Sequence, residues 1–172
     1  LSWGKCKIEH TTSIAGAVPA GAVWRLLDTP KEDTTKVTPT AGTAKEAREE
    51  GGGLVDYKAV KNTYLLEFDI FVKKGQSAPF SDEDGVVAGE HAFRVIPEDE
   101  SCEGCLIERS NLRVDVSFST AEGKMLHHSA QGLKPASGNT VKPFVANGLS
   151  LSKNDLFFGN AADNTGKQVT VT

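Results

Sequence analysis

The sequence lacks the features of a membrane protein, a nucleic-acid-binding protein and a disulfide-stabilised protein. None of its apolar runs approaches the roughly 18 consecutive residues that a membrane-spanning helix needs. The formal net charge of −4 argues against a cationic groove for phosphate, which requires clustered Lys and Arg side chains. The chain has only three cysteines, an odd number, so we expect reduced thiols and no disulfide framework.

Motifs of catalytic and ligand sites are missing as well. There is no serine in a G-x-S-x-G elbow, no phosphate-binding loop and no dinucleotide fingerprint. The one C-x-x-C pair, Cys102 and Cys105, lacks the second pair of ligands that a zinc site needs. The acidic turn Asp82–Gly85 lacks the later glutamate of a calcium loop. We therefore expect no enzyme activity, no catalytic residues, no metal and no cofactor.

The four histidines form no chelating pattern in the sequence. His10 and His91 are isolated from other histidines. His127 and His128 are adjacent, and neighbouring residues of a β-strand point to opposite faces. We therefore expect no histidine site.

Two segments show the alternation of apolar and polar residues that is typical of a β-strand with one buried face. They are Tyr64–Val72 and Asn111–Ser119. Because the apolar side chains of each segment share one parity, we expect them to meet in a single core. The predicted core residues are Tyr64, Leu66, Phe68, Leu112, Val114, Val116 and Phe118.

The remaining segments favour a mainly β fold. Shorter strands are predicted at Lys5–His10, Ala22–Leu27, His91–Ile96 and Leu106–Ser110. Thr43–Glu50 contains good helix formers without an apolar stripe, so any helix there should be short and exposed. Thr120–Ala130 is ambiguous between helix and strand. The whole pattern predicts a β-sandwich or barrel with a long polar loop and at most one or two short helices.

The character of the chain changes near its C-terminus. Residues 1–147 are expected to form one β domain, and residues 148–172 a C-terminal β-hairpin. Leu149–Phe158 and Gln168–Thr172 both alternate and are separated by a polar turn. This hairpin resembles the opening of bacterial immunoglobulin-like modules, in which an LSLS strand leads to a VTVT strand.

The most unusual segment is the long loop Asp28–Gly53, which has almost no bulky apolar side chain. Long loops without secondary structure are uncommon inside compact domains and are usually functional. With little to bury against its own domain, this loop cannot offset the entropy lost on ordering. We expect it to contact another subunit, with Gly51–Gly53 as its hinge. The predicted contact residues are Lys31, Glu32, Asp33, Lys36, Lys45, Glu46, Arg48, Glu49 and Glu50.

Several of these segments together resemble the major tail tube proteins of long-tailed phages and prophages. The segments are Thr29–Asp33, Thr43–Gly52, the pair Val55 and Asp56, and the strand Tyr64–Phe71, within a similarity that covers Trp24–Phe118. The resemblance implies a tail-tube-like β domain and a non-catalytic virion protein, assembled in the host bacterial cytoplasm. Six copies would form a ring, and stacked rings would form the tail tube.

The same resemblance implies the partners of the protein. They are other copies of the chain, other tail proteins, and DNA that passes through the lumen without specific binding. An acidic balance fits this role, because a lumen that repels phosphate lets DNA slide. No membrane partner is expected.

An alternative hypothesis is a secreted β-sandwich that adheres to surfaces or binds glycans, as the C-terminal hairpin suggests. Such a module should stay monomeric and expose an aromatic platform. A tube subunit should instead form rings, and the loop Asp28–Gly53 should become ordered only in the assembly.

Overall fold

The computed structural model describes residues 4–146, and the regular structure in this part of the chain consists of strands alone. The mainly β prediction is therefore confirmed, whereas the C-terminal hairpin predicted at 148–172 lies outside the described residues. The strands are β1 (Lys7–Ser13), β2 (Arg25–Leu26), β3 (Lys36–Thr40), β4 (Lys45–Arg48), β5 (Leu54–Lys58), β6 (Thr63–Phe71), β7 (Asp82–Glu83), β8 (Val86–Val87), β9 (Glu90–Ile96), β10 (Gly104–Ser119), β11 (Gly123–Gly132) and β12 (Val141–Phe144).

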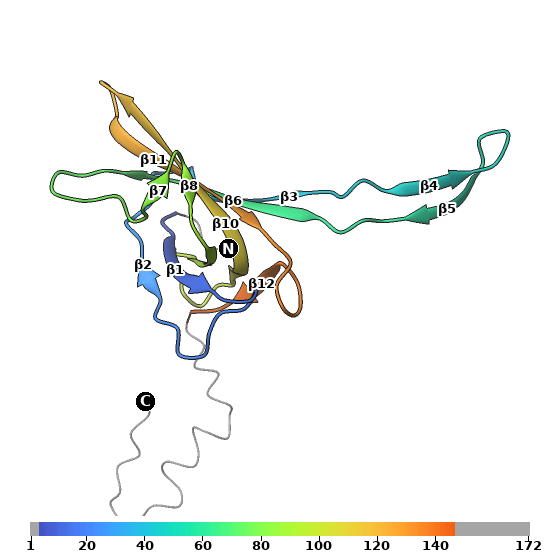
Figure 1. Ribbon diagram of the computed structural model, residues 1–172, viewed down its shortest axis with the longest axis horizontal. Helices are drawn as coiled ribbons and strands as arrows, with labels where there is room; N and C mark the ends of the chain where they lie inside the picture. The colour runs from blue at the N-terminus through green and yellow to red at the C-terminus, as the bar shows by residue number, and fades with distance from the viewer. Residues whose placement is uncertain (1–3, 147–172) are drawn as a thin grey trace, which may run out of the picture.

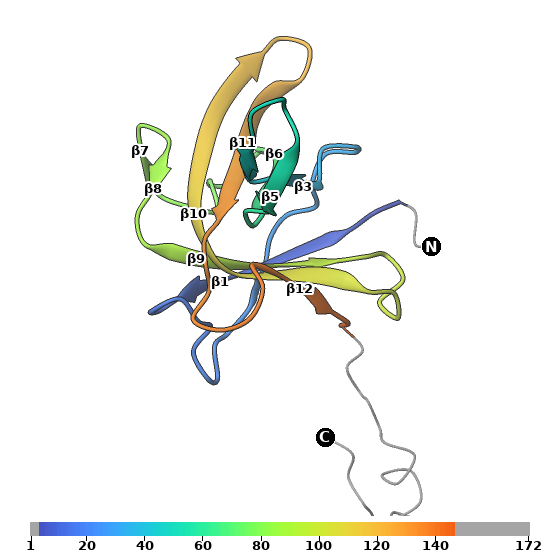
Figure 2. The same ribbon diagram turned by 90° about the vertical axis from the view of Figure 1, so that its right-hand side faces the viewer.

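Ten of the strands form one antiparallel sheet that curls into a half-barrel (Figures 1 and 2). Its main path runs β2-β1-β9-β10-β11-β6-β3, with β12 and the small β7–β8 hairpin attached to β10. The first part of β10 pairs with β9 and its second part pairs with β11. The register with β9 shifts between Ile107 and Ser110, and such a bulge bends a strand. The long strand β10 therefore joins the two halves of the sheet.

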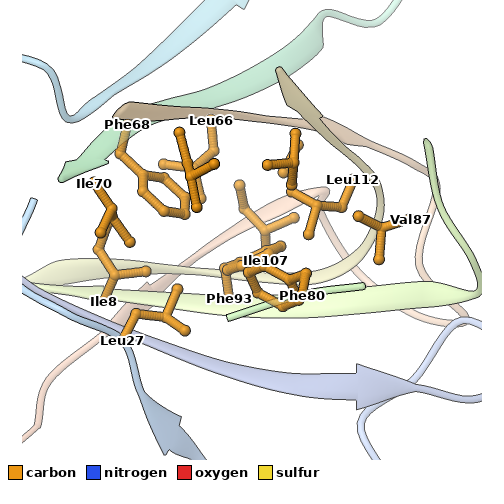
Figure 3. Packing of buried hydrophobic residues seen from close by; sticks show 13 residues of the cluster. Ile8, Leu27, Leu66, Phe68, Ile70, Phe80, Val87, Phe93, Ile107 and Leu112 are labelled. Carbon is orange, nitrogen blue, oxygen red and sulfur yellow. The ribbon is translucent and has the colours of Figure 1, made fainter. Parts of the chain in front are cut away.

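The core lies on the inner face of the curl (Figure 3). Its buried residues are Ile8, Leu27, Leu66, Phe68, Ile70, Phe80, Val87, Phe93, Ile107, Leu112, Val114, Leu126 and Ala130. Four of the predicted core residues are among them, so the parity of the two best strands is confirmed for Leu66, Phe68, Leu112 and Val114.

The prediction was wrong for the end of the second strand. There, in β10, Val116 is 57% exposed and Phe118 is 75% exposed. On the other strand, β6, Tyr64 is only partly buried. The β10–β11 hairpin extends beyond the rest of the sheet in Figure 1, so no opposing layer covers its end. Parity indicates which face a side chain occupies, but it does not indicate how far along the strand that face is covered.

Local predictions failed where propensity competed with strand pairing. Thr43–Glu50, expected to be a short helix, contains strand β4, which pairs with β5. The ambiguous Thr120–Ala130 is a turn followed by β11. Leu106–Ser110 is no separate strand but part of β10, and the strand predicted at Ala22–Leu27 shrinks to β2. Helix propensity is a weak signal without an apolar stripe, and tertiary pairing overrides it.

The core also contains histidines, which the sequence analysis treated as isolated. His10 Nε2 lies 2.9 Å from His91 Nδ1, so the two are paired. His91 Nε2 lies 3.1 Å from the carbonyl oxygen of Ala88, and it must donate the hydrogen there. In the neutral pair, His91 Nδ1 therefore accepts the hydrogen of His10 Nε2. The ring of Phe80 meets His10 edge-on, with the centroids 4.7 Å apart.

His128 is a third member of this buried cluster. Its ring stacks on Phe68 with a centroid distance of 4.7 Å and an interplanar angle of 4°. His127, its neighbour, is 40% exposed at the side chain, so the two rings occupy opposite faces as predicted. Burial lowers the pKa of His128 to about 4. Burial lowers the pKa of His10 to about 4 as well, assisted by the charges of His91 and Arg25, and it also lowers the pKa of His91.

These lowered pKa values predict that acid destabilises the fold. The unfolded chain binds protons at an ordinary histidine pKa near 6.5, whereas the folded cluster resists them until about pH 4. The stabilisation is therefore complete above pH 6.5 and is lost as the pH falls toward 4. For His128 the shift corresponds to at most about 3 kcal/mol. Urea unfolding at pH 7 and pH 4.5 should show a loss that the variant His128→Phe reduces. Equal pH dependence of both proteins would contradict the assignment.

The two phenylalanines of the predicted core should respond differently to truncation. Phe68 is completely buried, so Phe68→Ala should lower the free energy of unfolding by about 3–5 kcal/mol. Phe118→Ala removes an exposed side chain and should change it by no more than about 0.5 kcal/mol in the unassembled protein. Denaturant titration of both variants checks the difference. Similar losses in the two would mean that the end of β10 is covered after all.

Candidate assembly interface

A long β-hairpin, called the arm here and comprising residues 41–62, projects from the body at the right of Figure 1. Its strands β4 and β5 form a two-stranded sheet of their own, separate from the main sheet. No residue of the arm is buried, and only Gly42 and Ala44 are even partly covered. An isolated two-stranded hairpin is at best marginally stable in water. Contact with a neighbouring molecule would therefore stabilise the arm.

The arm begins where β3 ends and finishes where β6 begins. These strands pair antiparallel from Lys36 with Glu67 to Thr40 with Thr63, and both then run into the arm. A β-carbon on Gly42 would lie 2.6 Å from the carbonyl oxygen of Lys61, so only glycine lets the two sides approach so closely. The two sides of the hairpin thus lie very close together at the root of the arm.

The three glycines Gly51–Gly53 lie at the tip of the arm, not at its base. Gly51 and Gly52 adopt φ values of 98° and 88°, which other residues rarely reach. The amides of Glu49 and Gly52 donate hydrogen bonds to the carbonyls of Gly53 and Glu49, each at 3.0 Å. The glycines therefore form the reversing turn, and the expected hinge role is not supported by their position.

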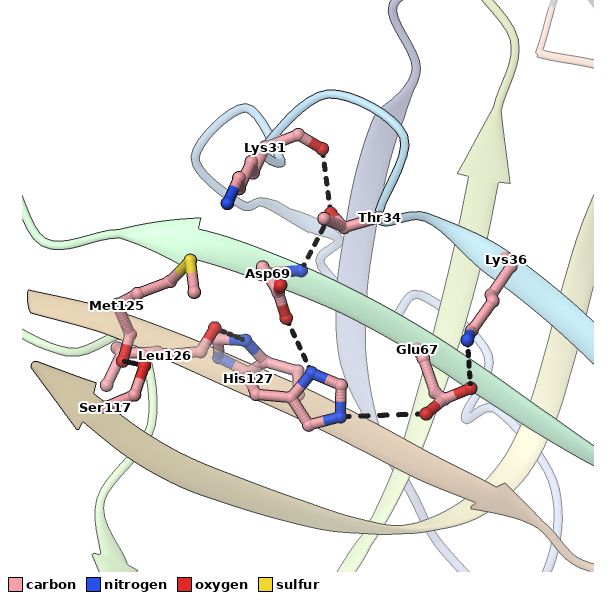
Figure 4. Close-up of polar contacts among 10 residues, drawn as sticks. Lys31, Thr34, Lys36, Glu67, Asp69, Ser117, Met125, Leu126 and His127 are labelled. Carbon is pink, nitrogen blue, oxygen red and sulfur yellow. Dashed lines mark hydrogen bonds and ion pairs between the residues drawn. The ribbon is translucent and has the colours of Figure 1, made fainter. Parts of the chain in front are cut away.

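A polar network fastens β3 and β6, the strands that carry the arm, to β11 at the end of their pairing away from the arm (Figure 4). Lys36 Nζ lies 3.2 Å from Glu67 Oε2, and the other carboxylate oxygen of Glu67 lies 3.7 Å from His127 Nε2. His127 Nδ1 donates to Asp69 Oδ1 at 2.6 Å. The backbone amide of Asp69 donates to the hydroxyl of Thr34, just before β3. These contacts join β3, β6 and β11, and so connect the strands that carry the arm to the rest of the sheet.

The predicted loop residues therefore separate into two groups. Lys45, Glu46, Arg48, Glu49 and Glu50 are on the arm. The other four are on the body: Lys36 is on β3, and Lys31, Glu32 and Asp33 line a groove. The loop is also not structureless, because it includes β3 and β4.

The charges of the arm are unevenly placed. Lys45 lies directly opposite Lys58 in the register of β4 and β5. Like charges opposite each other destabilise a hairpin. Neither lysine has an ion-pair partner within the described residues, whereas Arg48 pairs with Glu46 at 2.8 Å. The arm thus presents two uncompensated ammonium groups side by side.

The arm also carries apolar side chains that the sequence analysis missed. Leu54, Val55, Tyr57 and Val60 are between 45% and 66% exposed. They follow the glycines and so lie beyond the polar loop as it was delimited from the sequence. Clustered exposed apolar residues mark interaction sites more often than scattered ones do. The alternation after Gly53 was the signal that could have identified them.

The groove on the body has a volume of about 750 Å³ and lies between the loop Thr29–Thr35, the residues before β1, and the turn from β9 to β10. Carboxylates predominate among its charged lining residues, which are Glu32, Asp33, Glu98 and Glu103 against the two cations Lys5 and Lys31. Lys31 already pairs with Glu122. Apolar side chains line its walls, among them Val95 and Pro97.

Two of the cysteines line the same groove. Burial, with a contribution from nearby Cys6, raises the pKa of the Cys105 thiol to about 11. A thiol that stays protonated at neutral pH is a poor nucleophile. Cys6, Cys102 and Cys105 are all free thiols in the structure. The residues that line the groove are therefore acidic and apolar groups and an unreactive thiol, a combination that suits binding better than catalysis.

Other kinds of site are not evident in residues 4–146. Within this range, no three His, Cys, Asp or Glu side chains are arranged to hold a metal ion. The same residues include no helix that is long and apolar enough to cross a lipid bilayer.

Comparisons with known proteins add no evidence on function. No model of a known protein family matches the chain, and no curated protein sequence matches it.

Proposed function

We propose that this protein is a structural subunit that assembles with copies of itself through the arm, as the tail tube subunit of a long-tailed phage or prophage. Six copies form a ring, and rings stack into a conduit for DNA. The observation that carries the proposal is the arm, which is ordered as a hairpin, extends from the paired strands β3 and β6, and is uncovered along its length.

The energetics of the arm support assembly. Ordering each backbone residue costs about 1–2 kcal/mol, and the arm buries nothing on its own body in return. Its exposed apolar side chains, such as Leu54 and Tyr57, gain free energy only when another molecule covers them. A contact of this kind, repeated around and along a tube, accumulates stability even when each copy contributes little.

The choice of a tube rests on the resemblance to tail tube proteins, with which the described features agree. That family combines a mainly β domain with a long segment ahead of its central strands, and here the arm precedes β6. The net charge of −4 suits a conduit in which DNA moves without specific binding. Other tail proteins and the virion are the partners and location that this role requires.

The alternative of an adhesive or glycan-binding module has less support. A sugar platform needs exposed aromatic rings close together. The exposed Tyr57 lies on the arm and the exposed Phe118 lies at the end of β10. Trp24 packs its ring against the guanidinium of Arg94, 3.8 Å from the ring centroid, and so serves the body.

Removing the arm should separate folding from assembly. A variant in which residues 43–61 are replaced by a short Gly-Ser turn keeps β3, β6 and the polar network that joins them to β11. It should retain the circular dichroism spectrum and melting temperature of the unassembled protein. Negative-stain microscopy should show rings or tubes for the intact protein and none for the variant.

The deletion must not extend to Lys31. Residues 31–40 include β3, and the amide of Lys31 donates to the carbonyl of Asp69 at 2.8 Å, so their loss would damage the sheet. Tubes of normal length from the armless variant would show that the arm is not the connector. A strictly monomeric intact protein at high concentration and low salt would contradict the proposed function itself.

A further inference from the structure

We propose that the acidic groove on the body receives the arm of a second copy of the same chain. This inference rests on the proposed function and adds to it the surface on which the arm binds. The arm and the groove are separate features of one subunit, so each copy offers one arm and one receptor.

The groove has negative charge that the body does not neutralise. Glu32, Asp33, Glu98 and Glu103 are exposed, and none of the four forms an ion pair with any described residue. They converge from two separate parts of the chain, the loop before β3 and the turn from β9 to β10. The repulsion among them falls when a cation enters the groove.

The arm has four cationic and four acidic side chains and so no net charge, but two of its lysines lie together. Lys45 and Lys58 are held opposite each other by the register of the hairpin, and both lack a partner within residues 4–146. Carboxylates placed against these two lysines would relieve the repulsion on both sides at once. Charge complementarity of this kind sets the register of an interface and excludes wrong pairings.

Apolar groups on both surfaces add to the match. Pro30, Val95 and Pro97 line the groove between its acidic edges. The exposed Leu54 lies on the same arm as the lysines, whereas Tyr57, next to Lys58 in β5, lies on the opposite face of the hairpin. Interfaces commonly combine an apolar centre with a charged rim, so the groove and the arm are of corresponding construction.

The contact would be heterologous, because the arm and the groove are different surfaces. Heterologous contacts repeat from copy to copy and generate rings or open stacks, whereas a contact between identical surfaces stops at a dimer. The arm-in-groove contact thus accounts for one of the two repeated contacts, within a ring or between rings, that a tube of stacked rings requires.

Charge reversal tests the contact. The variants K45E/K58E on the arm and E98K/E103K on the groove should each raise the protein concentration needed for half-assembly by about tenfold or more. The four-residue variant that combines them exchanges the charges and should assemble within about threefold of the unmodified protein. Sedimentation velocity over a concentration series measures all three.

Two controls make the result specific. K73E/K74E reverses exposed lysines of the β6–β7 loop, and Glu83→Lys reverses an exposed carboxylate on β7; both should leave assembly unchanged. Circular dichroism and thermal melts establish that each variant is folded. If a reversed variant unfolds, the neutral variants K45Q/K58Q and E98Q/E103Q replace it and should show a smaller weakening in the same direction.

The outcomes separate this inference from the proposed function. Rescue by the combined variant supports the arm-in-groove contact. Assembly that depends on the arm but is unaffected by E98K/E103K, or that the combined variant fails to rescue, overturns the groove as the receptor and leaves the proposed function intact. Absence of any assembly by the unmodified protein overturns both.

Discussion

The pairing of β3 with β6 is the constraint on which the proposed interface depends. It joins the edge of the main sheet to the root of the arm, in a register from Lys36 with Glu67 to Thr40 with Thr63. The chain on both sides of this pairing continues outward into the arm, whose strands β4 and β5 form their own small sheet. The contacts of His127 with Glu67 and Asp69 extend the fastening to the next strand.

The large apolar residues of the described structure are either buried in the core or exposed on the surface. Those on the inner face of the curl, with Phe68 and Phe93 at the centre, hold one subunit together. Those on the arm stay exposed in the single chain, and so does Phe118 at the end of β10. The exposed apolar side chains on the arm and at the end of β10 are therefore available to the neighbour that we propose.

The sequence predicted the strands whose pattern is local and missed what depends on distant contacts. The parity of β6 and the middle of β10 identified Leu66 and Leu112, because alternation directly reports a buried face. The pairing of His10 with His91 could not be predicted, since it arises from the register of β1 and β9. The charged loop was recognised from the sequence. Its division into the arm and the groove could not be, because it depends on the long-range pairing of β3 with β6.

The central claim is that the arm is stabilised by a neighbouring subunit. Hydrogen–deuterium exchange of the backbone amides of β4 and β5, compared between dilute and concentrated protein, tests it most directly. The account predicts rapid exchange in the dilute subunit and strong slowing on assembly, while amides of β6 near Phe68 stay protected in both. Arm amides that exchange at the same rate under both conditions would contradict it.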